Sequence, residues 1–507
     1  MRRFLSLFLL TLLVTLVVGV VSAQDDTATA EPVTLRMMTF NVLYGGDEID
    51  FDQVIAAIVA ADADIVGLQE PMGNTHVIAE AAGYDHADER MHIISRFPLL
   101  TPPDFDGTYI FAEVSPGNVI ALSNVHLTSD PYGPYLVRDG EPLENVLALE
   151  STLRLPEIGR HLAVLPNLIE AGYPVLWTGD FNSPSHYDWT QTTTDARDDI
   201  AAYPVEWNVS RTIELMGFVD TWRVAHPDPV ERPGYTWTPA EPPLVYEDEV
   251  DDRIDWVLAG GNVTVLSSEL LGEAGNPDID IVVDPWGSDH RAVVSELELI
   301  PAPAPTMIST DEYRAQPGEL FTIRYMTNGA DLIIRAMSFG IDDAPLNAIN
   351  EEFAVNGAGS VMLTPHPELR TSFLIELMTP SGAILQSLAI DLDAPQSSPG
   401  IAVSSTTDSL RLDPLYTFVV GEPIYAQIDD APGNRLDWVG VYTAGDEDME
   451  NYWLFRYVGA KVDAVVTIGA ALDSYDAFPL PPGEYVLRLM LDDDYIMLAE
   501  SEPFTIE

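Results

Sequence analysis

Six apolar segments in the first 300 residues end in polar side chains. The segments are TLRMMTFNVLY, DIVGLQE, NVHL, PVLWTGDFNSPS, RIDWVLA and SDHRAVV. Short apolar runs of this kind are typical of buried strands. Because buried polar groups are costly without partners, the pattern predicts strands that end together at a site lined by their polar side chains.

Helical patterns lie between these segments. Asp50, followed three residues later by Gln53, predicts a helix start. The apolar face of that helix is expected to comprise Val54, Ile55, Ile58 and Val59.

Two further helical stretches are predicted in the same region. One covers residues 143–170, with breaks at Pro156 and Pro166, and the other covers 210–216 and ends at Gly217. Strands alternating with helices predict a layered α/β domain over residues 31–300.

The pattern changes after residue 300. PAPAPT at 301–306 predicts a stiff linker, and short β-type runs with Gly, Pro and Asn turns follow it. A second linker at 394–400 divides them into two all-β domains, 307–393 and 401–507, each of the size of an immunoglobulin-like sandwich. Gly318-Glu319-Leu320 and Gly421-Glu422-Pro423 precede corresponding strands, which suggests a degenerate repeat.

The N-terminus has the features of a secretory signal peptide over residues 1–23. Arg2 and Arg3 precede an apolar run at 4–21, and Val21-Ser22-Ala23 is a small-residue cleavage pattern. We therefore expect a secreted protein that begins near Gln24. The run is long for a signal, so an uncleaved membrane anchor is the alternative. The absence of cysteine excludes disulfides and thiolate chemistry.

The net charge is −58, from 81 acidic and 23 basic residues, and Lys461 is the single lysine. This balance argues against a broad basic surface for nucleic acid. It fits a secreted protein that works in salt or near divalent cations, or simply a solubilising surface.

The polar residues at the segment ends form an ordered set: Asn41, Glu70, His126, Asp180, Asn182, Asp255, Ser288, Asp289 and His290. Oxygen ligands around a hard cation, with an imidazole oriented by a carboxylate, are suited to hydrolysis of a phosphate ester. Each residue also has a simpler interpretation; Asp255, for example, could be a buried acid paired with Arg253.

The ordered set closely resembles the endonuclease/exonuclease/phosphatase superfamily, whose pattern is a strand-end Asn, LQE, an internal His or Tyr, GDFN, a late Asp and SDH. The resemblance covers residues 35–297. It implies a four-layered α/β sandwich catalytic domain with the site at one edge, followed here by the two all-β sandwiches. His126 matches the branch that includes deoxyribonucleases and bacterial sphingomyelinases.

The resemblance also implies a role for each residue. Glu70, Asn41 and Asp289 are expected to lie at a Mg²⁺ or Mn²⁺ ion. His290, oriented by Asp255, is expected to be the general base or the imidazole that polarises the phosphate. Asp180 would orient the attacking water, Asn182 would bind a phosphoryl oxygen, and His126 would complete the catalytic set.

Aromatic and basic residues on loops after these segments are candidates for substrate binding: Tyr132, Tyr135, Arg138, Trp189 and Arg223. Such side chains can grip a base, a sugar or a choline head group. Packing of the loops is the alternative.

We therefore expect a secreted, metal-dependent phosphodiesterase acting on a small organic phosphoester or a phospholipid head group, with sandwich domains that bind a surface or polymer. An extracellular nuclease is the alternative among enzymes. A non-catalytic surface-binding protein is the alternative of another class.

Overall fold

The structure is a computed structural model of the 507-residue chain. It describes residues 31–507 except 104, 198–201, 240–248, 311–313, 339–349, 368, 370, 393–397, 405–416, 435, 459–460, 470–478 and 492–493. The predicted signal peptide lies outside the described residues. Within them, no helix has the length and apolar character needed to cross a membrane.

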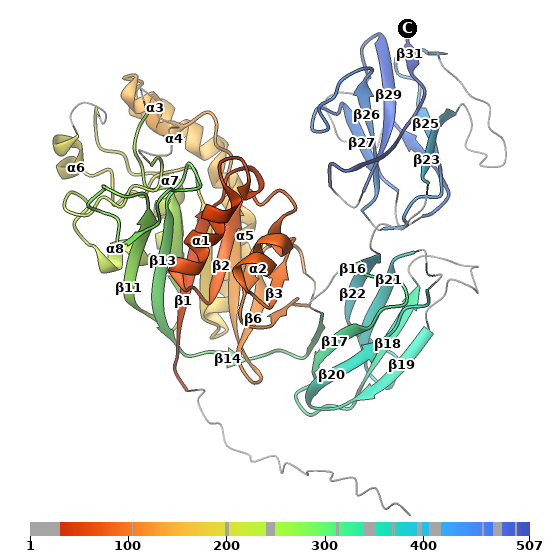
Figure 1. The fold of residues 1–507 in the computed structure, drawn as a ribbon, viewed down its shortest axis with the longest axis horizontal. Coiled ribbons are helices and arrows are strands. Elements are labelled where there is room, and N and C mark those ends of the chain that lie inside the picture. Colours follow the sequence, from red (N-terminus) through yellow and green to blue (C-terminus); the bar gives the residue numbers. More distant parts are fainter. Residues whose placement is uncertain are drawn as a thin grey trace, which may run out of the picture.

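Two seven-stranded sheets form the first domain (Figure 1). The first sheet has the order β12 (Ile281–Val282), β11 (Val263–Gly272), β13 (Ala292–Leu299), β1 (Val33–Asn41), β2 (Ile65–Gln69), β4 (Ile93–Ser95), β3 (His86–Asp88). The second has the order β5 (Leu99–Leu100), β6 (Ile110–Ser115), β7 (Asn118–His126), β8 (Val175–Asp180), β10 (Asp255–Gly260), β9 (Phe218–Asp220), and β14 (Ala302–Pro303) also pairs with β7.

Helices cover the outer faces of the two sheets. α1 (Phe51–Ala61) and α2 (Thr75–Ala82) pack on the first sheet, and α5 (Arg154–Glu170) and α7 (Asn208–Leu215) pack on the second. The remaining helical elements are η1 (Tyr44–Gly46), α3 (Gly133–Arg138), α4 (Leu143–Thr152), α6 (Gln191–Ala196) and α8 (Thr221–Ala225). A third apolar core lies between the sheets, which confirms the predicted four-layered α/β sandwich.

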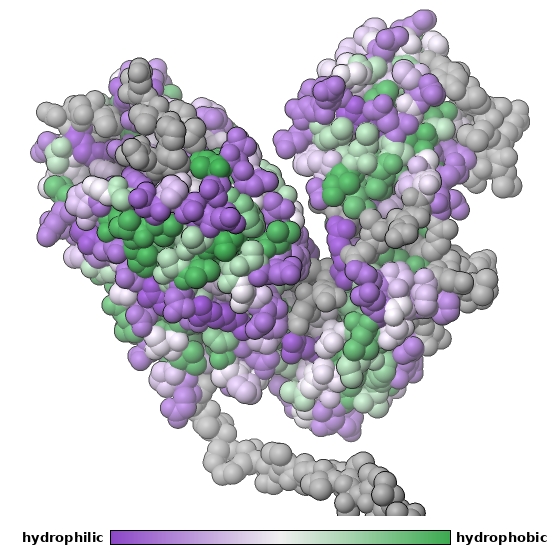
Figure 2. Space-filling model, in the orientation of Figure 1, coloured by the Kyte–Doolittle hydropathy of each residue, from purple (hydrophilic) through white to green (hydrophobic). Residues whose placement is uncertain are grey.

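The predicted helix start at Asp50 is confirmed. Asp50 is the N-cap of α1, and its side chain accepts a hydrogen bond from the backbone N–H of Gln53. Val54 and Ile58 are buried, but Val59, which we expected on the same face, is 58% exposed. Figure 2 shows apolar surface over α1 and α2, set in a largely hydrophilic face.

The breaks predicted at Pro156 and Pro166 are wrong. The helical stretch divides instead at Leu153, between α4 and α5. Pro156 lies in the first turn of α5, where a backbone N–H has no acceptor within the helix. Pro166 lies inside α5, which continues to Glu170. Burial of one face of α5 against the second sheet, through Ile158 and Leu165, offsets the hydrogen bond lost there.

Two sandwich domains follow, as predicted. The first pairs a sheet of β15 (Met307–Ser309), β17 (Phe321–Met326), β20 (Ala358–Leu363) with one of β16 (Arg314–Ala315), β22 (Ile384–Leu392), β21 (Phe373–Met378), β18 (Leu332–Ser338), β19 (Asn350–Val355). The second pairs β23 (Gly400–Ser404), β25 (Ile424–Asp429), β28 (Ala464–Ile468) with β24 (Thr417–Phe418), β31 (Phe504–Ile506), β29 (Gly483–Met490), β26 (Trp438–Thr443), β27 (Leu454–Tyr457), and β30 (Met497–Glu500) adds to β29.

The two sandwiches have the same topology, which supports the predicted repeat. In each, a three-stranded sheet faces a sheet whose first strand pairs in parallel with the last strand of the domain, β16 with β22 and β24 with β31. Gly318 and Gly421 occupy equivalent turns with φ of 88° and 87°, a conformation that favours glycine.

The segment 301–306, predicted as a stiff linker, is packed into the first domain. Ala302 and Pro303 pair with β7, and Ala304 is buried in the same apolar core as Trp177. The apolar side chains that follow the linker explain the difference, because Met307 also fills this core. The second linker, 394–400, lies largely outside the described residues; Gly400, its last residue, begins β23.

Candidate active site

The polar side chains at the strand ends face the space between the two sheets. In a strand, alternate residues point to the same face. Leu35 and Met37 of β1 contribute to the core between the sheets, so Asn41 has the same direction. Leu176 of β8 likewise shares its direction with Asp180. The inner face of β1 and β8 is therefore apolar at its start and polar at its last positions, Thr39 and Asn41 on β1 and Thr178 and Asp180 on β8.

A layer of polar residues that the sequence analysis missed lies beneath the site. Asn124 Oδ1 accepts hydrogen bonds from Gln69 Nε2 at 2.7 Å and from Thr178 Oγ1 at 2.9 Å. Gly67 allows the sheets to approach here, because a Cβ atom at this position would lie 2.0 Å from Thr178 Oγ1. Asn124 and Thr178 lie two residues before His126 and Asp180, so the alternation of inward positions along a strand could have indicated them. Gln69 directly precedes Glu70.

Asp180 is at the centre of the site. It lies directly beside His126 on β7 and beside Asp255 on β10. From the opposite sheet, Asn41 Nδ2 donates to Asp180 Oδ2 at 3.1 Å. The Asp180 side chain is almost fully buried, and burial together with the Asp255 carboxylate raises its pKa.

His290 bridges two carboxylates. Its Nδ1 lies 2.9 Å from Asp255 Oδ2, and its Nε2 lies 3.6 Å from Asp180 Oδ2. Burial disfavours the imidazolium, but the carboxylates of Asp255 and Asp180 outweigh burial and raise the pKa of His290 to about 10. The alternative pairing of Asp255 with Arg253 does not occur, since Arg253 forms ion pairs with Asp188 and Asp220.

Glu70 approaches the site from a turn rather than from its strand. Its φ is 58°, and its backbone carbonyl accepts from Gly45 N at 2.7 Å. Its side chain accepts from Tyr44 N at 3.1 Å and from Asn41 Nδ2 at 3.3 Å. His126 Nε2 lies 3.8 Å from Glu70 Oε1, so Glu70 joins the same cluster as Asp180.

The SDH segment joins the site from the start of β13. Ser288 Oγ donates to the Asn41 carbonyl at 2.7 Å and accepts from His290 N at 3.1 Å, which fixes the segment against β1. Asp289 is 9% exposed, and burial and then the Glu70 carboxylate raise its pKa.

Asn182 supports the site through its backbone and its side chain. It has a φ of 47°, and its Nδ2 donates to the Leu127 carbonyl at 2.9 Å. Its backbone N–H donates to Asp180 Oδ1 at 2.9 Å. In this conformation Asn182 orients Asp180, and its carboxamide nitrogen keeps a second N–H, so the predicted contact with a phosphoryl oxygen stays a prediction.

The donor set fits a divalent cation. Glu70, Asp180, Asp255 and Asp289 bring four carboxylates together, and Asp255 Oδ1 and Asp289 Oδ1 are buried without a hydrogen-bond partner in the described part of the chain. Ligand atoms of Asp180, Asp255 and His290 lie within 4.8 Å of one another. Buried carboxylates at this density are stable when a cation or imidazolium balances them, and oxygen ligands select hard ions.

Three of the candidate substrate-binding residues are structural instead. Tyr132 and Trp189 are buried, and both donate to the carboxylate of Asp252, at 3.1 and 2.9 Å. Arg223 is buried and pairs with Asp188 at 2.5 Å. Their polar atoms are satisfied within the domain, so they are not available to a ligand. The alternative of loop packing is the correct one.

Tyr135 and Arg138 lie on α3 and are partly exposed. Tyr135 donates to Glu249 at 3.0 Å, and the Arg138 guanidinium lies 4.6 Å from the Tyr135 ring and pairs with Asp139. The structure brings neither into contact with the cluster around Asp180. Their role in substrate binding stays a prediction.

An aromatic residue that the sequence analysis missed lies at the site. The ring of Trp237 is 4.9 Å from that of His290, and the backbone of Trp237 pairs with both Asp252 and His290. Trp237 therefore packs against His290 and pairs with its backbone. The TWT segment has no apolar run around it, and so gave no signal.

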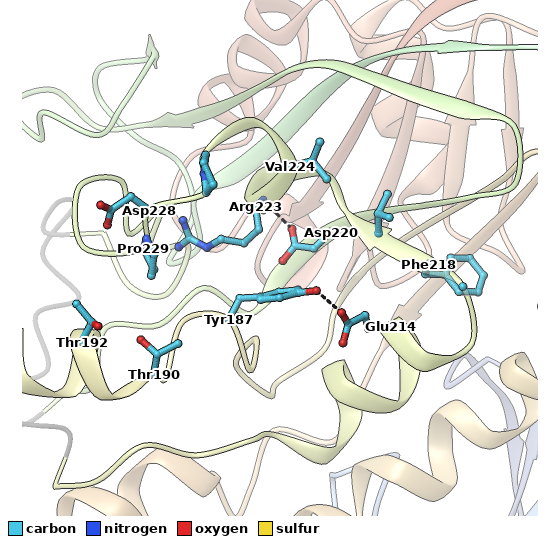
Figure 3. A pocket seen from close by; sticks show the side chains of 13 residues that line it. Tyr187, Thr190, Thr192, Glu214, Phe218, Asp220, Arg223, Val224, Asp228 and Pro229 are labelled. Atoms are coloured by element: carbon cyan, nitrogen blue, oxygen red, sulfur yellow. Dashed lines mark hydrogen bonds between the residues drawn. The ribbon is translucent and has the colours of Figure 1, made fainter.

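A separate cavity of about 840 Å³ lies beside the edge strand β9 (Figure 3). Phe218, Val219 and Val224 line it together with Tyr187, whose hydroxyl donates to Glu214. It contains none of the cluster around Asp180, and Arg223 at its floor is paired as described above.

Comparisons with known proteins agree with this geometry. The model of the endonuclease/exonuclease/phosphatase family matches residues 38–290. An uncharacterized protein of Caenorhabditis elegans is 28% identical over 295 residues, which are 52% of this chain and 92% of that protein.

Solved structures resemble the chain at low identity. An endonuclease/exonuclease/phosphatase from Beutenbergia cavernae is 17% identical and covers 70% of this chain and 99% of its own, with a TM-score of 0.33. An AP endonuclease from Archaeoglobus fulgidus is 17% identical and covers 52% of this chain and 98% of its own, with a TM-score of 0.32.

The family match extends from β1 to His290 and so includes every residue of the cluster. The interpretation as a non-catalytic binding protein is therefore set aside. The chain belongs to the endonuclease/exonuclease/phosphatase family and is a divalent-metal-dependent hydrolase of phosphoester bonds.

Proposed function

We propose that the protein is a secreted phosphodiesterase that uses Mg²⁺ or Mn²⁺ to hydrolyse a small organic phosphoester or a phospholipid head group. The choice of a small substrate rests on one observation, namely that nearly all basic residues of the first domain are already paired with carboxylates. Residues 31–300 contain twelve arginines and no lysine. Eleven of the arginines form ion pairs with carboxylates of the same domain.

Paired arginines are poorly suited to hold a long nucleic acid. Binding to a polyanion depends on Lys and Arg that neutralise several phosphates at once. The twelfth arginine, Arg160, donates to His161. A compact diester presents one phosphate, which a cation and the residues around Asp180 can neutralise by themselves.

Glu70, Asp289 and Asn41 would hold the ion. An ion bound between Asp180, Asp255 and His290 would compete with the hydrogen bond of the Asp255–His290 pair. Asp289 Oδ1 has no hydrogen-bond partner in the described part of the chain, and Glu70 accepts from Asn41 and Tyr44 but takes no part in the Asp255–His290 pair. The cation supplies charge neutralisation of the phosphate and of the leaving oxygen.

The protein's own groups handle the proton. Asp255 accepts from His290 Nδ1 and fixes the tautomer, which directs Nε2 toward Asp180. Nε2 is the atom able to take or return a proton. Asp180, held by Asn41 and the Asn182 backbone, orients the attacking water.

Secretion is supported by the basic and apolar N-terminus and its small-residue cleavage pattern, and the absence of cysteine is compatible with it. The sandwiches would attach the enzyme to a surface or polymer. Recovery of the protein outside expressing cells, with a chemically determined N-terminus near Gln24, tests this part. Retention in the membrane with Met1 intact would favour the anchor.

Activity of the purified protein in a metal-free buffer tests the function. Bis-p-nitrophenyl phosphate, sphingomyelin, DNA and phosphomonoesters serve as substrates, with Mg²⁺ or Mn²⁺ added. Hydrolysis of diesters should appear only with the ion. Glu70→Gln should abolish it, whereas the matched change Glu80→Gln, at an exposed position of α2, should not. Full turnover in excess chelator would refute the metal dependence.

A further inference from the structure

The second sandwich reaches the loop that carries Glu70. A Cβ atom at Gly73 would lie 3.8 Å from Asp494 Oδ2. Gly73 follows Glu70 by three residues, and Asp494 belongs to the turn after β29. In Figure 1 the second sandwich lies on the α2 side of the first domain, where this loop leads into α2. Residues 421 positions apart in the chain therefore meet beside the site.

The Glu70 loop is firmly built. Asn74 Nδ2 donates to the Gly45 carbonyl at 3.0 Å, and Gly45 N donates to the Glu70 carbonyl. Two side chains on these loops project into solvent, Tyr44 at 59% and Met72 at 56% exposure. The rim of the site on this side is thus apolar and fixed in position.

The turn after β29, of which Leu491 and residues 494–496 are described, is also fixed. Leu491 N donates to the Ile496 carbonyl at 3.0 Å, and Asp494 N donates to the Leu491 carbonyl at 2.7 Å. Trp438 Nε1 donates to the Asp494 carbonyl at 3.2 Å. We refer to these residues as the β29 turn.

Buried hydrogen bonds cross both domain junctions. Between the first domain and the first sandwich, Thr101 N donates to Ser309 Oγ at 2.8 Å. Between the two sandwiches, Ser372 N donates to the Gly433 carbonyl at 3.0 Å and Leu392 N to Asn434 Oδ1 at 2.8 Å. These contacts are buried, which favours a defined arrangement of the three domains.

The β29 turn presents a carboxylate and apolar groups. Asp494 Oδ1 accepts from Tyr495 N at 2.7 Å, and Oδ2 is the oxygen beside Gly73. Tyr495 is 43% exposed and Ile496 is 51% exposed. A carboxylate at the rim repels a polyanion passing over it, while the apolar groups accept an organic head group or an acyl region.

We propose that the β29 turn forms one side of the entrance to the phosphoester site and selects compact substrates over long polyanions, with Asp494 as the specificity-determining residue. This rests on the proposed function, whose substrate class it narrows. The second sandwich then has a role in substrate choice and not only in attachment.

Crosslinking in the full chain tests the contact. Because the chain has no cysteine, Gly73→Cys with Asp494→Cys introduces the only two thiols. A short bismaleimide should join them, as detected by mass spectrometry of the linked peptides. Because a side chain at Gly73 is strained at a φ of 80°, Met72→Cys with Tyr495→Cys provides a second pair. Gly73→Cys with Glu484→Cys, at the far end of β29, should remain unlinked.

Charge reversal tests the selectivity. Asp494→Lys should raise kcat/KM on a single-stranded oligonucleotide by roughly tenfold relative to bis-p-nitrophenyl phosphate. Its kcat/KM on the small diester should stay within about twofold of the wild type. The matched variant Glu484→Lys makes the same charge change ten residues earlier, at the start of β29, and should change neither.

The outcomes separate the two proposals. If neither cysteine pair crosslinks, or if Asp494→Lys and Glu484→Lys behave alike, the β29 turn is not part of the entrance. If both pairs crosslink but the wild type hydrolyses no diester with either ion, the proposed function fails, and the contact between the domains stands.

Discussion

Two buried carboxylates on neighbouring strands, Asp180 and Asp255, lie directly opposite each other in the second sheet. Like charges so placed are destabilising unless a positive group lies between them. His290 lies within 3.6 Å of both. The residues that serve catalysis are therefore also those that make this arrangement stable.

The Asp255→Asn variant should lose activity through His290. An amide presents a donor as well as an acceptor to Nδ1 and no longer enforces one tautomer. We expect kcat/KM on a small diester to fall by about 10²-fold or more. The exposed change Asp85→Asn is the control. Because the two groups act as a unit, kcat/KM of the double variant Asp255→Asn/His290→Ala should be no lower than that of His290→Ala alone. If the losses in kcat/KM multiply instead, the two residues act independently.

His161 should make the stability of the first domain depend on pH. It is buried against Trp177, and burial and then Arg160 lower its pKa from 6.5 to about 4. The unfolded chain binds a proton near pH 6.5, whereas the folded chain binds it only near pH 4. The stabilisation by the neutral ring is thus complete above pH 6.5 and is lost as the pH falls toward 4.

The loss amounts to about 3 kcal/mol. Urea unfolding at pH 7 and pH 4, compared with His161→Gln, isolates it from the many carboxylates that titrate in both proteins. The wild type should lose about 3 kcal/mol more than the variant. Equal losses would mean that the folded protein binds a proton on His161 as readily as the unfolded chain does.

At the scale of elements, β14 and β15 join the first domain to the first sandwich. Met307 is 1% exposed and shares a core with residues of β7, β8 and α5, as well as with Met326 of β17. Gln386 Nε2 donates to the carbonyls of Thr101 and Ile308, at 3.3 and 2.8 Å. The domain boundary is therefore a packed interface.

Met307→Ala should destabilise the first domain by about 3 kcal/mol, through lost burial and the cavity left behind. Met362→Ala, at a position 62% exposed on β20, should cost less than about 0.5 kcal/mol. Thermal unfolding measures both. In the same way, a fragment ending at Pro301 should melt below one ending at Ser309. Equal stability of the two fragments would show that the packing of Met307 contributes little.

At the scale of the whole molecule, the protein carries a large negative net charge. With 81 acidic residues against 23 basic ones, its field repels polyanions, and added salt weakens that repulsion. Duplex DNA should therefore be a poorer substrate than a small diester, by kcat/KM in the same Mg²⁺ buffer. A series of salt concentrations distinguishes repulsion of DNA by the acidic surface from attraction of DNA by a basic groove. Efficient DNA cleavage that falls steeply with salt would reveal a basic groove and favour the nuclease alternative.

The sequence by itself determined the fold class and the polar residues clustered around Asp180. Apolar runs identify buried strands because burial fixes their composition, and the polar residue that ends each run stands out against it. Asn41, Glu70 and Asp180 could be predicted for this reason, and Asp289 likewise stands just before the run that forms β13. The N-cap at Asp50 could be predicted because the helix start depends on residues only three apart.

The tertiary structure alone decided which polar residues are available. Tyr132, Trp189 and Arg223 are of residue types that are common at binding sites. In the folded chain, however, Tyr132 and Trp189 donate hydrogen bonds to Asp252, and Arg223 forms an ion pair with Asp188. Trp237, the layer around Asn124 and the contact of Gly73 with Asp494 depend on pairing between sheets and domains, and no local pattern records such pairing. Local interactions set which elements form, whereas the positions of side chains at a site depend on contacts between residues far apart in the chain, and these exist only once the chain is folded.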